Sequence, residues 1–255
     1  PEVSEISGGL MARWPVAPVM RWLDNQSLRR SAAIIVLSQD MADTLAARGL
    51  GILPVHVINN FELDSFGTAE PPPPALRKRA GKRRVIFAGN LGRFQSLPLL
   101  SEGVAHLFDS RPELELFFLG DGAALAELRA RWAGHPQVSF GPFLPFSQAR
   151  ELIQEADIGL VALMPGVYRV AYPSKVATYL SLGLPVLALV EPGSNLAREL
   201  TNKGYGRVPS EPTPQAIATC LSELLDAPHA VDAARISDRA ATEDALVALF
   251  AGLAK

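Results

Sequence analysis

The chain has 255 residues, of which 48% are hydrophobic, and its formal net charge is −2. These values predict a globular protein with a substantial core and give no reason to expect nucleic acid binding. The single cysteine, Cys220, excludes an internal disulfide and favours a reducing compartment or indifference to one. We expect no signal peptide and no membrane span, because no apolar run is long enough, and no metal site, because the four histidines are scattered.

The first part of the chain predicts two helices and two strands. Residues 10–30 have the pattern of an amphipathic helix that carries Trp14 and Trp22. The next expected elements are a buried strand at 33–37, a helix that Ser38 caps and Gly49 ends, and a strand at 55–58.

The composition changes between Glu62 and Arg84, where we place a domain linker. The stiff polyproline stretch Pro71–Pro74 is followed by a cluster of basic residues. The members of this basic cluster are Arg77, Lys78, Arg79, Lys82, Arg83 and Arg84. We interpret the cluster as a solvated flank of the linker rather than as a phosphate site.

After the linker, strand patterns alternate with helix patterns. The expected strands lie at 85–88, 114–119, 138–140, 158–162 and 186–190, and a short piece follows at 206–208, where we expect the sheet to end. The expected helices lie at 96–108, 123–133, 147–156 with Ser147 as its cap, 174–182, 194–203, 213–226, 229–240 and 241–253. This alternation predicts an α/β, Rossmann-like fold, in which one parallel sheet has helices on both faces.

The stretch from Ala171 to Leu200 combines a helix start with polar groups. Pro173 fits the first turn of a helix, and Ser174 and Lys175 stand at the N-terminus of that helix beside unpaired backbone N–H groups. This arrangement suits an anion such as phosphate. The alternative is an ordinary loop–helix–strand unit with a surface lysine.

Four loops that follow strands are rich in glycine or proline. They are Gly89–Arg93, Gly120–Gly122, Gly141–Pro145 and Pro192–Asn195. Parallel strands place such loops at one end of the sheet, where ligands bind in doubly wound folds. Tight turns also need glycine, so no single loop decides. Together with Lys175 the loops predict a cleft for a phosphorylated ligand, without a Walker-type loop or a dinucleotide glycine fingerprint.

Five short motifs follow one another in the order of a known family. They are Phe87-Ala88-Gly89-Asn90-Leu91-Gly92, Phe118-Leu119-Gly120-Asp121-Gly122, Ala156-Asp157-Ile158-Gly159-Leu160, Pro173-Ser174-Lys175 and Gly183-Leu184-Pro185-Val186. From Ser31 to about Leu200 the chain resembles glycosyltransferase family 4, whose GT-B enzymes use nucleotide sugars. The Gly-Asn-Leu-Gly and Pro-Ser-Lys variants resemble the branch that builds bacterial surface polysaccharides, near the colanic acid and O-antigen enzymes.

The resemblance implies the C-terminal half of a GT-B fold and a partial N-terminal domain. Residues 1–61 are expected to be a remnant of the acceptor-binding domain, whose early strands are missing, and residues 62–84 are the linker. Residues 85–240 are expected to form the nucleotide-sugar donor-binding domain. Residues 241–255 are expected to form a helix that crosses back toward the N-terminal domain.

The chain departs from the family at the positions that usually grip the donor. Many members have two glutamates that hold the donor sugar and ribose, and these positions are Val170 and Thr178 here. The usual Arg and Lys after the first strand of the donor domain fall at Asn90 and Gln95, which leaves Arg93 as the nearest substitute.

By resemblance we assign the donor site to loops and helix starts. The assigned residues are Gly89, Asn90, Gly92, Arg93, Phe143, Leu144, Ser174, Lys175, Thr178, Gly193, Ser194 and Asn195. Arg93 and Lys175 are expected to bind the diphosphate, together with backbone groups at Gly89, Gly92, Ser194 and Asn195. Phe143 and Leu144 are expected to contact the base, and Thr178 the ribose. No catalytic residue, metal or cofactor is assigned.

The resemblance implies a retaining glycosyltransferase in bacterial surface polysaccharide synthesis. The expected partners are a nucleoside diphosphate sugar and a saccharide or polyprenyl-linked acceptor. We expect a cytoplasmic protein, with Trp14, Trp22 and neighbouring arginines either at the inner membrane surface or packed against the rest of the N-terminal domain. We expect this chain alone to be inactive. The alternative function is a non-catalytic nucleotide-sugar-binding or scaffolding protein.

Overall fold

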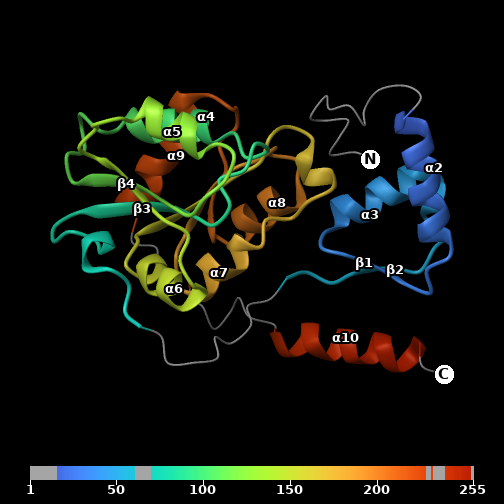
Figure 1. Cartoon of the computed structure of the whole chain (residues 1–255). Coiled ribbons are helices and arrows are strands. Elements are labelled where there is room, and N and C mark those ends of the chain that lie inside the picture. The colour runs from blue at the N-terminus through green and yellow to red at the C-terminus, as the bar shows by residue number, and fades with distance from the viewer. Residues whose placement is uncertain (1–15, 61–69, 228–230, 232–238, 254–255) are drawn as a thin grey trace. The chain divides into compact units, whose positions relative to one another are not determined.

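The computed structural model describes residues 16–60, 70–227, 231 and 239–253, which divide into two compact units (Figure 1). Unit 1 comprises Pro1–Phe61, Pro165–Tyr172 and Asp238–Lys255, and unit 2 comprises Glu62–Met164 and Pro173–Ser237.

Unit 1 contains a small parallel pair of strands. Its elements are α2 (Val16–Arg29), β1 (Ile34–Val36), α3 (Gln39–Leu45), the π-helix η2 (Ala46–Leu50), β2 (Val55–Val57), the 3-10 helix η4 (Val167–Arg169) and α10 (Arg239–Leu253). Ser38 caps α3 as predicted, because its side chain accepts a hydrogen bond from the Met41 amide. Strand β1 is not fully buried, since Ile35 is 41% exposed. Residues 10–15 of the predicted first helix, with Trp14, lie outside the described residues.

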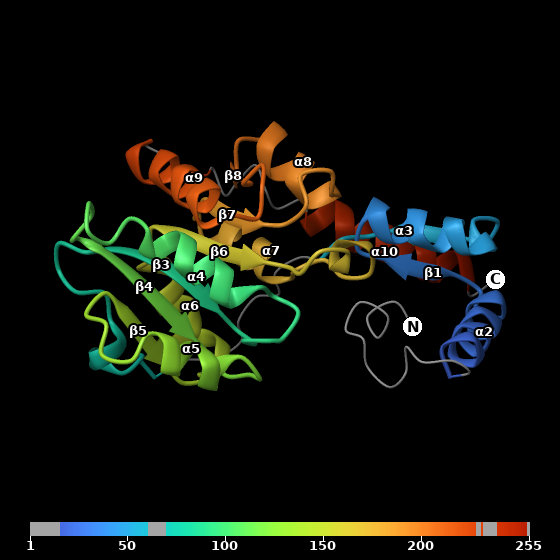
Figure 2. The same cartoon turned by 90° about the horizontal axis from the view of Figure 1, so that it is seen from above.

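Unit 2 is built on one parallel sheet of six strands, as predicted (Figure 2). In spatial order the strands are β5 (Val138–Gly141), β4 (Leu114–Leu119), β3 (Arg83–Ala88), β6 (Ile158–Ala162), β7 (Val186–Leu189) and β8 (Gly206–Arg207). The chain adds β4 and β5 on one side of β3 and then returns to add β6, β7 and β8 on the other. The direction of winding therefore reverses between β3 and β6, which is where doubly wound folds bind ligands.

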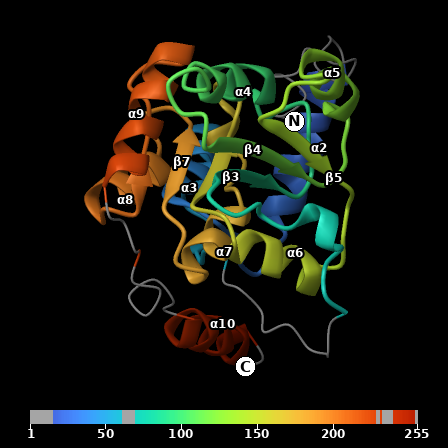
Figure 3. The ribbon, with the colours of Figure 1, turned by 90° about the vertical axis from the view of Figure 1, so that its left-hand side faces the viewer.

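Helices cover both faces of this sheet, with α4 and α5 on one side and α6 and α7 on the other (Figure 3). The helices of unit 2 are η3 (Pro74–Leu76, 3-10), α4 (Leu97–Ala105), α5 (Leu125–Arg131), α6 (Phe146–Gln154), α7 (Lys175–Ser181), α8 (Asn195–Asn202) and α9 (Pro214–Asp226). The prediction that Ser147 caps α6 is wrong, because Pro145 occupies the cap position and makes no side-chain bond. Most of the helix predicted at 229–240 lies outside the described residues.

The basic cluster, predicted to be solvated, is instead tied to the sheet by carboxylates. Arg84 is only 3% exposed, and its Nε lies 2.6 Å from an oxygen of Glu115, which is 2% exposed. The Arg84 guanidinium also lies 4.5 Å from the centre of the Phe117 ring. The further pairs are Arg77 with Glu151 and Glu155, Lys78 and Arg83 with Asp157, and Arg79 with Glu115. The interpretation as a solvated flank is therefore wrong for the buried Arg84, whereas the side chains of Arg77, Arg79 and Arg83 stay 40%, 60% and 42% exposed while they pair with carboxylates.

Candidate functional site

The loops after β3 and β4 approach each other closely at the carboxyl end of the sheet. A Cβ atom at Gly120 would lie 2.0 Å from the Gly89 carbonyl oxygen, and one at Gly122 would lie 2.5 Å from the Leu91 oxygen. Gly120 and Gly122 are therefore needed for contact between the loops. All three glycines have a positive φ, but Gly89, with a φ of 108°, differs because its Cβ position faces open space. Only Gly89 of these three glycines leaves room for a ligand.

Hydrogen bonds hold the loop that follows β3 in one conformation. They join Leu91 N–H to the Asp121 carbonyl (2.8 Å), Ala124 N–H to the Leu91 carbonyl (2.9 Å), Gly92 N–H to Gln95 Oε1 (2.8 Å) and Met164 N–H to the Phe94 carbonyl (2.8 Å). Gln95, which occupies the position of the family lysine, thus shapes the loop. Bonds within the protein therefore fix the conformation of this loop.

The same loop ends in a strained residue. Ser96 has a φ of 42° and is the one non-glycine residue with positive φ among those described. Its side chain makes no capping bond to α4, although its carbonyl accepts from the Leu100 amide. Backbone strain of this kind costs about 1–3 kcal/mol and clusters at functional sites.

Arg93 stands exposed on this loop. Within the described part of the chain it forms no hydrogen bond or ion pair, which leaves its guanidinium free to bind an anion. Asn90 is also exposed, and its side chain lies against Gly122, where a Cβ would come 2.6 Å from the Asn90 oxygen.

Lys175 begins α7, and its ammonium is buried without a hydrogen bond to any described residue. Its Nζ lies 3.3 Å from the centre of the Phe87 ring, at the end of β3. Burial lowers the pKa of this ammonium from 10.5 to about 7. A buried cation without a carboxylate partner is costly, and it becomes favourable when an anion reaches it.

The start of α7 contributes less than the sequence indicated. The helix has seven residues, and Ser174, which precedes it, is exposed and makes no side-chain capping bond. Thr178 lies one turn beyond, half-buried, and its hydroxyl has no hydrogen bond among the described residues. Val170, at the other family glutamate position, lies in unit 1.

Several backbone amides assigned to the donor already have acceptors. The amides of Gly89, Gly92 and Ser194 donate to Leu119, Gln95 and Glu191, respectively. The Ser194 side chain is buried and accepts from the Ala197 amide, so it caps α8. Gly193 is exposed with open space at its Cβ position, and Asn195 is half-buried. The charge for binding phosphate must therefore come chiefly from Lys175 and Arg93.

The loop between β5 and α6 presents an exposed aromatic side chain. Phe143 is 74% exposed, and Leu144 beside it is half-buried. An exposed aromatic ring suits stacking with a planar ligand. Strand β5 lies at the margin of the sheet, two places from β3.

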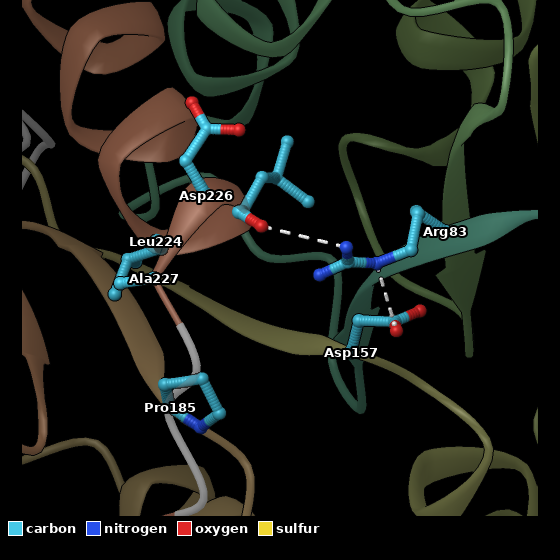
Figure 4. Close-up of a pocket in the computed structure, with 7 residues that line it drawn as sticks. Arg83, Asp157, Pro185, Leu224, Asp226 and Ala227 are labelled. Atoms are coloured by element: carbon cyan, nitrogen blue, oxygen red, sulfur yellow. Dashed lines mark hydrogen bonds and ion pairs between the residues drawn. The ribbon is translucent and has the colours of Figure 1, made fainter.

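A cavity of about 380 Å³ lies at the opposite, amino end of the sheet (Figure 4). Its lining residues are Arg83, Asp157, Pro185, Leu224, Leu225, Asp226 and Ala227. Arg83 donates to Asp157 at 3.0 Å and to the Leu225 carbonyl at 3.4 Å. The charges of Arg83 and Asp157 are thus matched within the protein, and we prefer the carboxyl end as the candidate site.

Two kinds of site are not found in the part of the chain that the structure describes. No group of three His, Cys, Asp or Glu side chains is placed to hold a metal ion. No described helix combines the length and the apolar content that crossing a membrane requires.

Comparison with known proteins identifies one curated relative, whereas no family model matches the chain. The relative, from Pseudomonas aeruginosa, is described as "Probable glycosyltransferase WbjE" and is 27% identical over 201 residues. The match covers 76% of this chain and 49% of the relative, so the chain spans about half the length of that protein.

Solved glycosyltransferases share the fold at low identity. HepE of Anabaena, solved with UDP and glucose, matches with a TM-score of 0.69 at 15% identity, over 91% of this chain and 66% of that one. Sucrose-phosphate synthase of Thermosynechococcus elongatus matches with a TM-score of 0.74 at 14% identity, over 98% and 65%. The structure is a partial GT-B fold. The predicted fold and the likeness to GT-B glycosyltransferases are confirmed, whereas family 4 itself stays a prediction.

Proposed function

We propose that the whole protein transfers a sugar from a nucleoside diphosphate sugar to a saccharide or polyprenyl-linked acceptor in bacterial surface polysaccharide synthesis, with unit 2 binding the donor. The observation that carries the proposal is the buried Lys175 ammonium, which has no hydrogen-bond partner among the described residues and lies beside the end of β3, at the reversal point of the sheet. Support comes from the glycosyltransferase relative and from HepE, whose structures contain UDP or UDP-glucose.

The donor diphosphate is the group that this end of the sheet fits best. Lys175 and the exposed Arg93 supply two cations, and Gly89 leaves room for a phosphate to approach the backbone. Phe143 is the candidate platform for the base, and the Thr178 hydroxyl is the candidate contact for ribose. Sugar transfer of this kind depends mainly on positioning the reactants and on stabilising the leaving diphosphate.

Two finer features belong to the same proposal. We take the enzyme to retain the anomeric configuration, as the family resemblance implies. We also take this chain by itself to bind nucleotide without transferring sugar, because it spans about half the length of the curated relative.

The N-terminal helix α2 is the proposed contact with an anionic membrane surface. It has no buried residue, and Trp22, Val19 and Leu23 are 59%, 54% and 49% exposed. Aromatic and aliphatic side chains beside Arg21 suit a membrane interface. The competing role is packing of α2 against another part of the protein. Sedimentation with anionic vesicles decides: equal partitioning of wild type and Trp22→Ala removes the membrane role.

Calorimetric titration tests donor binding directly. We expect one of UDP, GDP, ADP or dTDP to bind the chain, and its parent nucleoside to bind far more weakly. Binding of none of them contradicts the proposal. Turnover of the matching nucleotide sugar by a protein that includes the acceptor domain then separates a transferase from the non-catalytic alternative, which the transferase relative does not favour.

A further inference from the structure

The two central strands of the sheet separate before they end. In the part of the sheet that the structure describes, β3 pairs with β6 only at Val85 and Ile86, which face Ile158 and Gly159. By contrast, β3 stays paired with β4, and β6 with β7, through their last residues. The sheet therefore divides at its carboxyl end between β3 and β6. Backbone groups freed by such a division need new partners, because a buried amide without one is costly.

Tyr179 of α7 spans this division. Its hydroxyl accepts a hydrogen bond from the Ala88 amide at 2.8 Å and donates to the Ile86 carbonyl at 3.4 Å, both on β3. Its ring lies on β6, because a Cβ atom at Gly159 would come 2.4 Å from it. The side chain is fully buried, and burial raises the pKa of the hydroxyl, which therefore keeps its proton. One residue thus contacts both strands where they part.

Lys175 lies one helical turn before Tyr179, and its side chain also lies at the place where β3 and β6 separate. Phe87, which the Lys175 ammonium contacts, belongs to the core on the side of α4 and α9, as does Ile158. Gly159 points to the opposite face, because side chains alternate along a strand, and Tyr179 covers it there. Lys175 therefore reaches from α7 across the line along which β3 and β6 separate.

We propose that Tyr179 is a positioning residue of the nucleotide site: its hydroxyl holds the end of β3 where β3 separates from β6, and so holds the Gly89–Gly92 loop and the Lys175 ammonium where the diphosphate binds. The inference rests on the proposed function, since it concerns the same site. It assigns to Tyr179 a role in binding although Tyr179 itself need not touch the nucleotide.

The test compares Tyr179→Phe with a matched loss of a buried hydroxyl elsewhere. Ser101 is fully buried in α4, and its hydroxyl accepts from Trp132 Nε1 at 3.0 Å and donates to the Pro98 carbonyl at 2.7 Å. Tyr179→Phe and Ser101→Ala therefore each remove one accepted and one donated bond. Both variants are measured by thermal unfolding and by calorimetric titration with UDP, GDP and uridine or guanosine.

We expect both variants to unfold at a lower temperature, but only Tyr179→Phe to lose affinity for the nucleoside diphosphate, by roughly tenfold, because small displacements of binding groups are expensive. Its affinity for the parent nucleoside should change much less. If the two variants bind the diphosphate equally well, Tyr179 is merely structural and the inference is overturned. If wild type binds no nucleoside diphosphate, the proposed function fails first.

A measurement on wild type keeps the inference testable even if Tyr179→Phe does not fold. Hydrogen exchange should show the Ala88 amide as protected as amides within the β3–β4 ladder, and nucleoside diphosphate should further protect the Gly89–Gly92 loop. An Ala88 amide that exchanges at the rate of an exposed loop amide means that Tyr179 does not hold the strand, and overturns the inference.

Discussion

The two ends of the parallel sheet differ in how their buried basic side chains are paired. At the amino end, Arg84 is buried against Glu115, and Arg83 and Lys78 share Asp157. At the carboxyl end, the Lys175 ammonium is buried without any described hydrogen-bond partner. At the amino end the basic side chains are thus paired with carboxylates of the protein, whereas at the carboxyl end the Lys175 ammonium has no carboxylate partner among the described residues. We infer that each partner in the first arrangement is needed for stability, because its removal leaves a buried charge unpaired, and that the second arrangement serves an external anion.

The largest effect is expected from breaking the buried pair at the amino end. Arg84→Ala leaves the Glu115 carboxylate buried, with the exposed Arg79 as its one remaining ion-pair partner among the described residues, and should lower the free energy of unfolding by about 3–5 kcal/mol. Urea denaturation measures this loss. Arg131→Ala is the control, because its pair with Glu102 is exposed and should contribute less than about 1 kcal/mol.

Arg84→Ala also tests whether the two ends are independent. At a temperature where the variant is folded, its nucleoside diphosphate affinity should equal that of wild type. A large loss of affinity in folded Arg84→Ala would show that the amino-end pairs also shape the nucleotide site.

The second prediction concerns the loss of stability caused by burying the Lys175 ammonium. The pKa of Lys175 is about 7 in the folded protein and near 10.4 in the unfolded chain, so between these values the unfolded chain binds more protons and stability rises with pH. Lys175→Met removes this cost. We expect it to stabilise the protein by a few kcal/mol below pH 7, with the gain shrinking to nothing near pH 10. Denaturation at a series of pH values measures the difference, and a pH-independent difference contradicts the buried ammonium.

The third prediction compares how substitutions at the two ends of the sheet change the affinity for nucleoside diphosphate. Lys175→Ala and Arg93→Ala should each weaken nucleoside diphosphate binding roughly ten- to a hundredfold, because a charge-assisted contact with phosphate is lost. Lys78→Ala at the amino end should have almost no effect on binding, since Lys78 is paired with Asp157. Calorimetric titrations at two salt concentrations compare the three variants.

Further variants sharpen this contrast. Lys175→Arg should restore binding only in part, because a planar guanidinium does not replace an ammonium in a confined place. Wild-type affinity should fall as the pH rises above about 7, because the neutral lysine must take up a proton to bind phosphate. If Lys175→Ala and Lys78→Ala bind alike, the phosphate site lies elsewhere.

The parallel sheet could be predicted from the sequence because its signals are local. Strands such as 114–119 and 158–162 are short, mostly apolar runs, the first of which is interrupted only by Glu115, and both have the predicted bounds. The buried Arg84 could not be predicted in this way. Its partner Glu115 is 31 residues away, and a basic residue beside a polyproline stretch has the local pattern of a solvated linker.

The same holds for the candidate site: features set by neighbouring residues could be predicted, and contacts between distant residues could not. Glycine patterns located the loops, but only the structure separates Gly89, which leaves open space, from Gly120, which another loop requires. The bridge made by Tyr179 was missed because it joins α7 to β3, 91 residues apart. One signal was present in the sequence: Gly159 interrupts an apolar strand, and glycine within a strand often marks the close approach of another group.

The smallest predicted effect tests whether the carboxyl end stores strain. Ser96 has a φ of 42° and its side chain makes no capping bond, so Ser96→Gly loses no described side-chain hydrogen bond and removes the penalty of a left-handed backbone. We expect a gain of about 0.5–1 kcal/mol in the free energy of unfolding, reduced by the greater freedom of glycine in the unfolded chain. Nucleoside diphosphate affinity should not improve with it, because Ser96 closes the loop that carries Arg93 and glycine makes that loop less rigid. A less stable variant would mean that the Ser96 side chain supports the fold. A variant that gains both stability and affinity would mean that strain here serves no purpose in binding.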